Sequence, residues 1–283
     1  MIQVIATTPY TDQKMGTAGL RKKSKVVMQE HYFENFLQSI FNTIDPAGKT
    51  FVVGGDGRFY NSIAIQKLIK MAAANGVKKL IVGQNGFLST PASSNMILKR
   101  RTDGGFVLSA SHNPGGENGD FGIKFATETG GQGSSLVSDR IFAVSQTISE
   151  FKTVDAADID LSRLGMQNLE GMEIEIVDPI SDYVELMEKI FDFELIKKMF
   201  ADGFTMRFDA MNAVTGPYAI RIFEEILGAA KGSVLNAVPK PDFGGLHPDP
   251  NLVYAKELVN IMYADDAPDF GAANDGDGDR NMI

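Results

Sequence analysis

A polar loop at residues 109–116 places a hydroxyl next to an imidazole. Ser111 precedes His112, and the Asn-Pro and Gly-Gly pairs that follow favour an open turn. A Ser-His pair by itself is more often part of an exposed turn than of a site. A serine-hydrolase interpretation is weak, because no G-x-S-x-G elbow surrounds Ser111 and no third triad member can be identified. The loop, called the serine loop below, instead offers a hydroxyl that can carry a phosphoryl group.

A second loop, the aspartate loop at residues 275–280, has carboxylates at alternate positions: Asp275, Asp277 and Asp279. In extended backbone these side chains point the same way and can bind one hard divalent cation. The alternatives are a solvated acidic turn and an EF-hand. The EF-hand is rejected, because its sixth position holds Arg280 instead of glycine and the sequence ends before its twelfth. Three close carboxylates also repel one another unless a cation offsets their charge. Together the two loops predict a phosphoryl-transfer centre with Mg²⁺.

Basic residues provide a third component. The stretch at residues 14–23 contains glycines and ends in a cluster of cations, although a solvated basic run is the ordinary explanation. Lys124 lies just beyond the serine loop, where an exposed strand lysine is the alternative. Residues 55–58 are interpreted as a structural turn in which Arg58 pairs with a nearby acid. For His247 the sequence leaves two roles open: lining a cleft or a structural role.

Short apolar runs alternate with helical patterns, which is typical of α/β proteins with a mostly parallel sheet. Both special loops follow the carboxyl end of an expected strand, where parallel sheets bind ligands. Thr90 and Pro91 are expected to open a helix, with the threonine hydroxyl as its cap. Long loops are expected at 127–135 and 153–171. Strands are expected at 50–53, 79–82, 105–108, 172–177, 206–208, 233–238 and 270–273, and helices at 62–75, 90–100, 181–200, 217–227 and 251–263.

Composition narrows the class of protein. With 283 residues, 43% hydrophobic and 22% charged, the chain is expected to form one large or two ordinary soluble domains. A net charge of −9 argues against a general affinity for nucleic acid or anionic membrane. The absence of cysteine excludes disulfide and thiolate chemistry. No apolar run approaches the ~20 residues of a membrane span, and the first residues do not resemble a signal peptide, so a cytoplasmic location is expected.

Several segments together resemble phosphoglucomutase, of the α-D-phosphohexomutase superfamily. They are residues 16–21, 109–125 and 275–280, with matching flanks at 53–58 and 242–245. The eukaryotic-type branch, which includes the exocytosis-associated parafusins, is the most similar. The resemblance implies two α/β domains with mixed, mostly parallel sheets flanked by helices. Residues 1–178 match the first of the family's four domains, and residues 179–283 match a second domain truncated at its C-terminus.

The resemblance also implies roles for the residues of both loops. Ser111 matches the family's phosphoserine, and Asp275, Asp277 and Asp279 match ligands of Mg²⁺, with a phosphoserine oxygen completing the protein side. His112 matches a position near the transferring group, where it can donate a hydrogen bond or shuttle a proton.

Other matches concern substrate. Thr17, Arg21, Lys124 and Arg280 match positions that bind phosphate or substrate. Relatives commonly have serine where this chain has Ala18, which predicts a weaker hold on phosphate.

The implied activity is interconversion of glucose 1-phosphate and glucose 6-phosphate, with glucose 1,6-bisphosphate as intermediate and activator. The full-length protein is expected to be a cytoplasmic monomer that binds sugar phosphates. This chain is expected to be an incomplete, poorly active part of it, and its preference for glucose over other hexoses rests on the likeness alone. The alternative function is that of a non-catalytic, parafusin-like phosphoprotein acting as a scaffold in membrane fusion.

Overall fold

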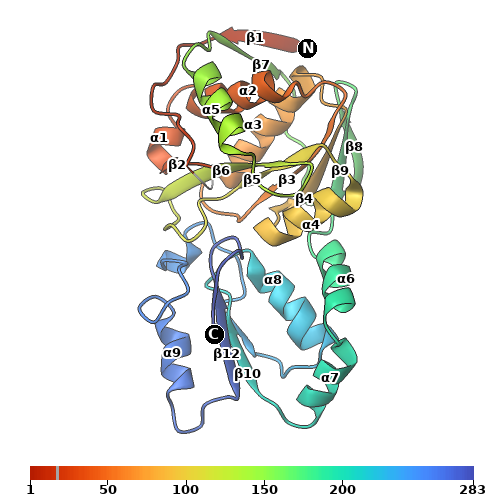
Figure 1. The fold of residues 1–283 in the computed structure, drawn as a ribbon, viewed down its shortest axis with the longest axis vertical. Coiled ribbons are helices and arrows are strands. Elements are labelled where there is room, and N and C mark those ends of the chain that lie inside the picture. The colour runs from red at the N-terminus through yellow and green to blue at the C-terminus, as the bar shows by residue number, and fades with distance from the viewer. Residues whose placement is uncertain (17–18) are drawn as a thin grey trace.

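Within residues 1–16 and 19–283, which the computed structural model describes, a seven-stranded sheet is the centre of the N-terminal part (Figure 1). Its strand order is β2-β6-β5-β3-β4-β9-β8. The inner strands β5, β3, β4 and β9 pair in parallel, and the outer pairs are antiparallel. The strand bounds are β2 Leu20–Lys23, β3 Thr50–Gly55, β4 Lys79–Phe87, β5 Gly104–Leu108, β6 Asp120–Thr127, β8 Gly165–Leu169 and β9 Met172–Val177.

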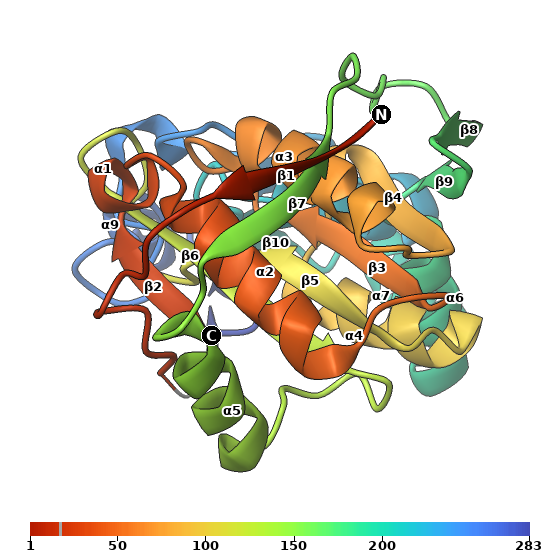
Figure 2. The same ribbon diagram turned by 90° about the horizontal axis from the view of Figure 1, so that it is seen from above.

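Helices cover both faces of this sheet because its inner strands are apolar on both sides. Phe51 and Val53 of β3 belong to one buried cluster, which also contains residues of α2 and α3, whereas Val52 packs with α4 on the other face. A two-stranded antiparallel ribbon, β1 with β7, crosses over α2 and α3 in the described part of the chain (Figure 2). The bounds are β1 Ile2–Ala6, α1 Ser24–Val27, α2 Tyr32–Ile44, α3 Asn61–Ala74, α4 Thr90–Arg100, α5 Ser135–Ser145 and β7 Glu150–Val154.

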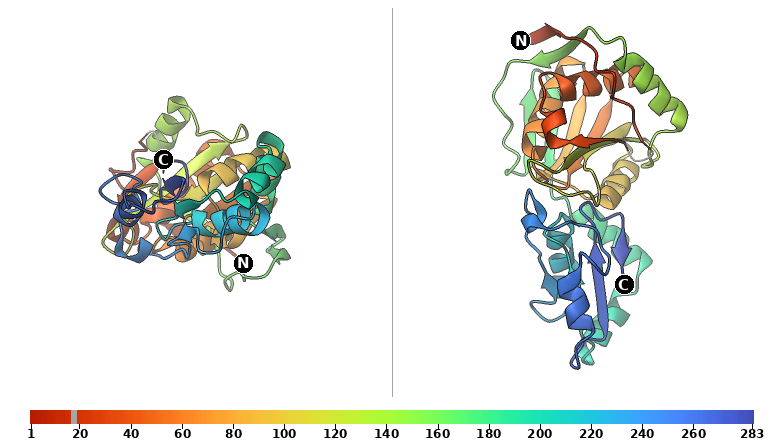
Figure 3. Two further views of the ribbon diagram at one scale, coloured as in Figure 1. Left: turned by 90° about the horizontal axis from the view of Figure 1, so that it is seen from below. Right: turned by 90° about the vertical axis from the view of Figure 1, so that its left-hand side faces the viewer.

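A second, four-stranded sheet lies in the C-terminal part of the described chain, with the order β11-β10-β12-β13 (Figure 3). Strand β13 is antiparallel to β12, and the other pairs are parallel. Helix α8 continues directly into the π-helical segment η1. The bounds are α6 Ser181–Ile190, α7 Phe193–Ala201, β10 Met206–Asp209, α8 Thr215–Ala219, η1 Ile220–Ile226, β11 Val234–Leu235, the 3₁₀ turn η2 Phe243–Gly245, α9 Lys256–Met262, β12 Phe270–Asn274 and β13 Asn281–Met282.

The two sheets are joined by a shared apolar cluster and by polar contacts. Tyr218 of α8 packs in the same cluster as Val52 of β3 and residues of α4. Its hydroxyl accepts a hydrogen bond from the Ser89 amide at 3.3 Å and donates to the Pro179 carbonyl at 2.9 Å. Asp182 of α6 pairs with Lys99 and Arg100 at the end of α4. None of the helices among the described residues has the length and apolarity that a membrane crossing requires.

The predicted fold class, two α/β units with mixed sheets flanked by helices, is confirmed. The single helix predicted at 181–200 was wrong: Phe191 is extended, and Asp192 caps a new helix by accepting a hydrogen bond from the Leu195 amide at 2.9 Å. The predicted loop at 153–171 contains the edge strand β8, whose polar residues gave no periodic signal. The helix predicted from 251 begins at Lys256, because Asn251 forms a side-chain turn with the following amides.

Candidate functional site

The serine loop leaves the carboxyl end of β5 and turns sharply at Ser111. The backbone of Ser111 lies in the left-handed region, with φ 54°, which is uncommon for a residue other than glycine. Its amide donates to the Ser109 hydroxyl at 2.7 Å. Its own hydroxyl is buried and donates to Asp275 Oδ2 at 2.7 Å, and it lies 3.3 Å from Asp279 Oδ1. The turn therefore directs the hydroxyl at the aspartate loop.

The aspartate loop connects β12 to β13 and gathers its three carboxylates around one point. Asp275, Asp277 and Asp279 each offer an oxygen, and these oxygens lie within 4.8 Å of one another. Asp275 is fixed by the amides of Asp279 and Arg280, which donate to its Oδ1 at 3.0 and 3.1 Å. Gly278, with φ 76°, provides the turn that brings the third carboxylate back. The arrangement matches the predicted convergence of alternate side chains.

The carboxylates fit a hard divalent cation. Asp277 Oδ1 is buried and has no hydrogen-bond partner among the described residues, which is costly unless another ligand binds it. Burial, followed by the charges of Asp277 and Asp279, raises the pKa of Asp275 to about 7. This electrostatic crowding is what a bound cation would relieve. An all-oxygen donor set of this kind suits Mg²⁺ or Ca²⁺.

Lys124 of β6 supplies an internal counter-charge. Its side chain is 3% exposed, and its Nζ lies 2.5 Å from Asp277 Oδ2 and 2.9 Å from Asp279 Oδ2. Burial alone would lower the pKa of Lys124, but the attraction of Asp277 and Asp279 outweighs it and raises the pKa. The same ammonium, with a hydrogen bond from Thr90, overcomes burial and lowers the pKa of Asp277. The alternative of an exposed strand lysine does not hold for Lys124, whose buried ammonium contacts the carboxylates of the aspartate loop.

The remaining predicted cations lie at the rim of the site. The His112 Nδ1 contacts Arg280 Nη1. Burial, and then repulsion by Arg280, lower the pKa of both His112 and Arg21. Arg21 is also within electrostatic reach of two carboxylates of the aspartate loop. Thr17 and Ala18 lie outside the described residues. The structure thus brings together all of the remaining predicted site residues. The ring of His247 stacks on that of His112, with the two ring centroids 6.4 Å apart.

Thr90 belongs to the site although the sequence suggested only a helix cap. Ser89 is the residue that caps α4, accepting from the Ala92 amide at 3.2 Å. The Thr90 hydroxyl instead donates to Asp277 Oδ2 at 2.7 Å, and its amide donates to the Asp277 carbonyl at 2.9 Å. The available signal was the position of Thr90, which opens a helix just after β4 at the carboxyl edge of the sheet.

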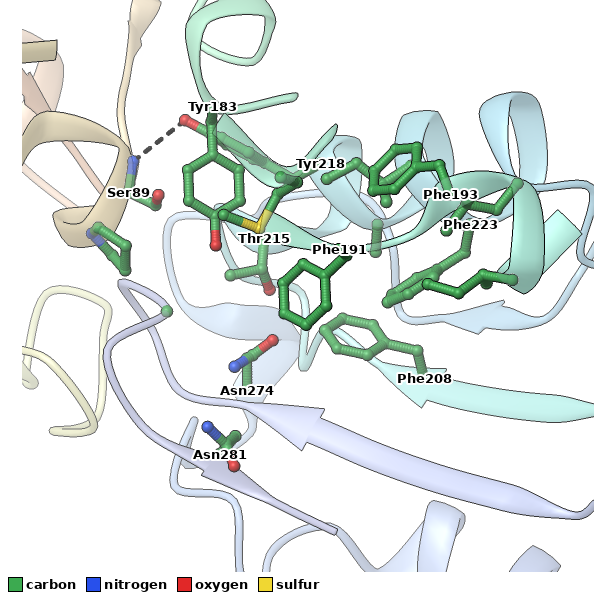
Figure 4. Close-up of a pocket in the computed structure, with 17 residues that line it drawn as sticks. Ser89, Tyr183, Phe191, Phe193, Phe208, Thr215, Tyr218, Phe223, Asn274 and Asn281 are labelled. Carbon is green, nitrogen blue, oxygen red and sulfur yellow. Dashed lines mark hydrogen bonds between the residues drawn. The ribbon is translucent and has the colours of Figure 1, made fainter. Parts of the chain in front are cut away.

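A cavity of about 360 Å³ lies behind the aspartate loop, between α6, α7, α8 and β10 (Figure 4). Its walls are mainly aromatic and aliphatic, and Gly278 and Ser89 close one end. Thr215 and two asparagines are among its few polar residues, and its lining, within the described chain, includes no Lys or Arg. A sugar phosphate needs cations and hydrogen bonds, so this apolar space does not fit one. Ser111 and the three carboxylates are not among the residues that line this cavity.

The fold and the site define an α/β protein with a buried serine facing a loop of three converging carboxylates. The family described as phosphoglucomutase/phosphomannomutase, alpha/beta/alpha domain I, matches residues 12–152. Domain II of the same family matches residues 181–283. The chain therefore belongs to the phosphoglucomutase/phosphomannomutase family.

Individual relatives agree with this assignment. The chain is 56% identical to a phosphoglucomutase of Rhizobium radiobacter, over 100% of this chain and 52% of the relative. It is 50% identical to a phosphoglucomutase of Emericella nidulans, over 100% of this chain and 51% of the relative. A solved structure from Paramecium, the exocytosis-sensitive phosphoprotein pp63/parafusin (phosphoglucomutase) in its open form, has TM-score 0.96 and 46% identity, over 100% of this chain and 54% of that one. The chain thus spans about half the length of the relatives it matches.

Proposed function

We propose that this chain supplies the phosphoryl carrier and the metal site of a phosphoglucomutase. The whole protein would interconvert glucose 1-phosphate and glucose 6-phosphate through a phosphoserine and glucose 1,6-bisphosphate. The observation that carries the proposal is the direct hydrogen bond from the Ser111 hydroxyl to Asp275, at 2.7 Å, within the carboxylate cluster. Relatives named phosphoglucomutase at 50–56% identity over the whole chain support it.

Ser111 is proposed as the residue that accepts and returns the phosphoryl group. Asp275, Asp277 and Asp279 would hold Mg²⁺ together with a phosphoserine oxygen, and the bound ion would supply charge neutralisation for the phosphoryl oxygens. The protein contributes position, because the left-handed turn fixes the hydroxyl against the carboxylates before any substrate arrives. His112 is proposed to hydrogen-bond the transferring group.

The cations of the site are proposed to bind the anionic substrate. Arg21 and Arg280 lie at the rim, where two guanidinium groups suit phosphate oxygens. Lys124 contacts two carboxylates of the aspartate loop, so its ammonium would also offset negative charge on a phosphoryl group bound beside them. Thr17, which lies within the stretch at residues 14–23, is proposed as a further phosphate contact on the basis of the sequence motif.

The division into residues 1–178 and 179–283 is also proposed. Strand β9 ends at Val177 and α6 begins at Ser181, and each part has its own sheet. Because relatives are about twice as long, the chain alone is expected to bind Mg²⁺ weakly and to turn over sugar phosphates little. A cytoplasmic monomer without affinity for nucleic acid is proposed for the whole protein; relatives include cytoplasmic and chloroplastic forms.

The direct test is mass spectrometry of Ser111 after incubation with glucose 1,6-bisphosphate and Mg²⁺. Wild type should gain one phosphoryl group on Ser111, and chelation of the metal should prevent it. Ser111→Ala is the matched control and should gain none. Phosphorylation of Ser111→Ala to the wild-type extent, or none in wild type, would contradict the proposal.

A second function is supported by the Paramecium structure, which is named both a phosphoglucomutase and an exocytosis-sensitive phosphoprotein. In this alternative the protein retains the mutase fold and is phosphorylated, but it acts as a scaffold and does not turn over sugar phosphates. The assay is mutase turnover by the full-length protein. Turnover that depends on glucose 1,6-bisphosphate and Mg²⁺ favours the enzyme, whereas a folded, phosphorylated protein without turnover favours the scaffold.

A further inference from the structure

We propose that Arg58 is the positioning residue of the serine loop: its buried guanidinium holds Ser111 in the left-handed conformation that presents the hydroxyl to the carboxylates. The inference rests on the proposed function, since it concerns how Ser111 accepts a phosphoryl group. Arg58 does not touch the reacting atoms, so its role is to act through Ser111.

Arg58 is buried together with a carboxylate. Its side chain and that of Asp56 are both 0% exposed, and the two residues are linked by a forked ion pair. The Arg58 Nε donates to both oxygens of Asp56 at 2.9–3.0 Å, and Nη2 lies 2.8 Å from Oδ2. Such a pair neutralises the charge of the guanidinium and fixes its plane. The remaining donors then point in directions set by β3 and its turn.

Those donors are directed at backbone carbonyls of the serine loop and of the start of β6. Nη2 donates to the Ser111 carbonyl at 2.7 Å, and Nη1 donates to the carbonyls of Asn113 at 3.3 Å and Asp120 at 2.9 Å. Nη2 thus binds the carbonyl of Ser111, and Nη1 binds the carbonyls at both ends of the segment from Asn113 to Asp120. One rigid group therefore fixes the loop at Ser111 and Asn113 and links it to the start of β6.

The Ser111 turn needs such support. A left-handed backbone at a non-glycine residue is strained and persists only where the surroundings impose it. The Ser111 amide donates to Ser109 and its carbonyl accepts from Arg58, so both polar groups of the strained residue are fixed. Without Arg58 the carbonyl would be free to rotate, and the hydroxyl would leave its 2.7 Å contact with Asp275.

The same guanidinium also contacts the surroundings of the aspartate loop. A Cβ added at Gly276 would lie 2.5 Å from the Ser111 carbonyl oxygen and 3.3 Å from Arg58 Nη2. The ring of Phe243 lies over the guanidinium, with its centroid 5.2 Å from Cζ. Arg58 therefore fills the place where the serine loop, the aspartate loop and the η2 turn meet. Glycine at 276 leaves room for this contact.

Two variants test the inference without relying on one another. Arg58→Lys keeps the charge opposite Asp56 but loses the fork, so one ammonium cannot reach all the carbonyls. Gly276→Ala retains both Arg58 and Asp56 but adds a Cβ that would lie 2.5 Å from the Ser111 carbonyl oxygen and 3.3 Å from Arg58 Nη2, so it disturbs the hydrogen bond between those two atoms. The matched controls are Arg100→Lys, at the α4–α6 ion pair, and Gly131→Ala, where an added Cβ meets nothing closer than 3.5 Å.

Two measurements are made on each protein of 283 residues. Hydrogen exchange reports protection of peptides covering residues 109–116, with α3 as internal reference. Mass spectrometry reports the rate of Ser111 phosphorylation by glucose 1,6-bisphosphate with Mg²⁺. In both test variants the loop should lose protection while α3 keeps it. Phosphorylation should slow by on the order of 10²-fold, the cost of misplacing a reacting group by about 1 Å. The controls should match wild type in both measurements.

The outcomes separate the two proposals. Loop protection equal to wild type in Gly276→Ala and in a folded Arg58→Lys overturns the positioning role, and so does an opened loop that is phosphorylated at the wild-type rate. If Arg58→Lys fails to fold, Gly276→Ala decides alone. If the loop loses protection in the variants but wild type is not phosphorylated, the positioning role of Arg58 is supported and the proposed function is contradicted.

Discussion

Lys124→Met removes an ammonium that lies between two carboxylates of the aspartate loop, 2.5 Å from Asp277 and 2.9 Å from Asp279. Breaking a buried pair by deleting one partner costs about 3–5 kcal/mol, because the other charge stays buried. We take the lower limit, about 3 kcal/mol, since the side chain of Asp279 is 30% exposed and reaches water. At about 2–4 °C per kcal/mol for a large domain, the metal-free variant should melt roughly 6–12 °C below wild type.

Magnesium should reverse much of this loss. The Lys124 ammonium contacts Asp277 Oδ2, an oxygen of the cluster that would bind the ion. Two positive charges about 4 Å apart repel each other by about 4 kcal/mol at an effective dielectric constant of 20, so the ammonium would weaken the binding of a cation. Even a tenfold gain in Mg²⁺ affinity in the variant equals about 1.4 kcal/mol. The rise in melting temperature on adding Mg²⁺ should therefore be roughly 3–5 °C larger for Lys124→Met than for wild type.

The assay is thermal unfolding followed by circular dichroism, with chelator and with Mg²⁺ in excess. The matched control is Lys67→Met, which removes a part-buried ammonium 2.6 Å from Glu34 on α2. It should lower the melting temperature equally with and without Mg²⁺. If wild type, Lys124→Met and Lys67→Met gain the same increment from Mg²⁺, then Lys124 does not share the carboxylates with a metal and the reasoning fails.

Two further predictions concern the contact between the sheets. Asp182→Asn should cost about 1 kcal/mol at neutral pH. Hydrogen bonds from Lys99 and Arg100 outweigh burial and lower the pKa of Asp182, so its contribution is present above the ordinary aspartate pKa and is lost as pH falls through the lower folded value. The difference in urea midpoint between variant and wild type should therefore vanish in acid. Tyr218→Phe should cost about 1 kcal/mol, since its hydroxyl bridges the sheets.

Asp202→Asn, at an exposed pair with Lys198, is the control for the pH experiment and should show little change at any pH. A loss for Asp182→Asn that persists undiminished in acid would show that the ion pair is not its cause. For Tyr218→Phe the melting temperature is compared with that of Tyr263→Phe, whose side chain is exposed. Equal melting temperatures would show that the bridging hydroxyl contributes nothing.

Much of the site was accessible from sequence because local patterns determine it. Alternate aspartates with intervening glycines can converge through local turns, and each loop follows a strand end, where α/β sheets bind ligands. The two loops belong to different sheets, so their meeting depends on contacts between the sheets, such as those of Thr90 with Asp277, which no local pattern predicts. The apolar runs of β3 and β4 likewise identify strands covered on both faces.

The contacts of Arg58 and Thr90 were not accessible in the same way. Arg58 pairs with an acid two residues away, as expected, but its bonds to Ser111 and Asp120 span more than fifty positions. Nothing local distinguishes it from an exposed turn arginine. The break between α6 and α7 is a similar case. Asp192 is an ordinary capping residue in an otherwise continuous helical pattern. The new helix that starts there packs Phe200 against the buried cluster of Met206 and Phe208 of β10, a contact that no local pattern predicts.

Backbone hydrogen bonds connect the two halves of the site directly. The Thr90 amide, from the first sheet, donates to the Asp277 carbonyl at 2.9 Å, and the amides of Phe59 and Gly116 both donate to the Pro241 carbonyl, at 2.8 and 3.1 Å. Opening a hinge between the sheets would break these bonds and separate Ser111 from Asp275. The serine loop and the aspartate loop are therefore expected to move as one body, which keeps the Ser111 hydroxyl against the carboxylates.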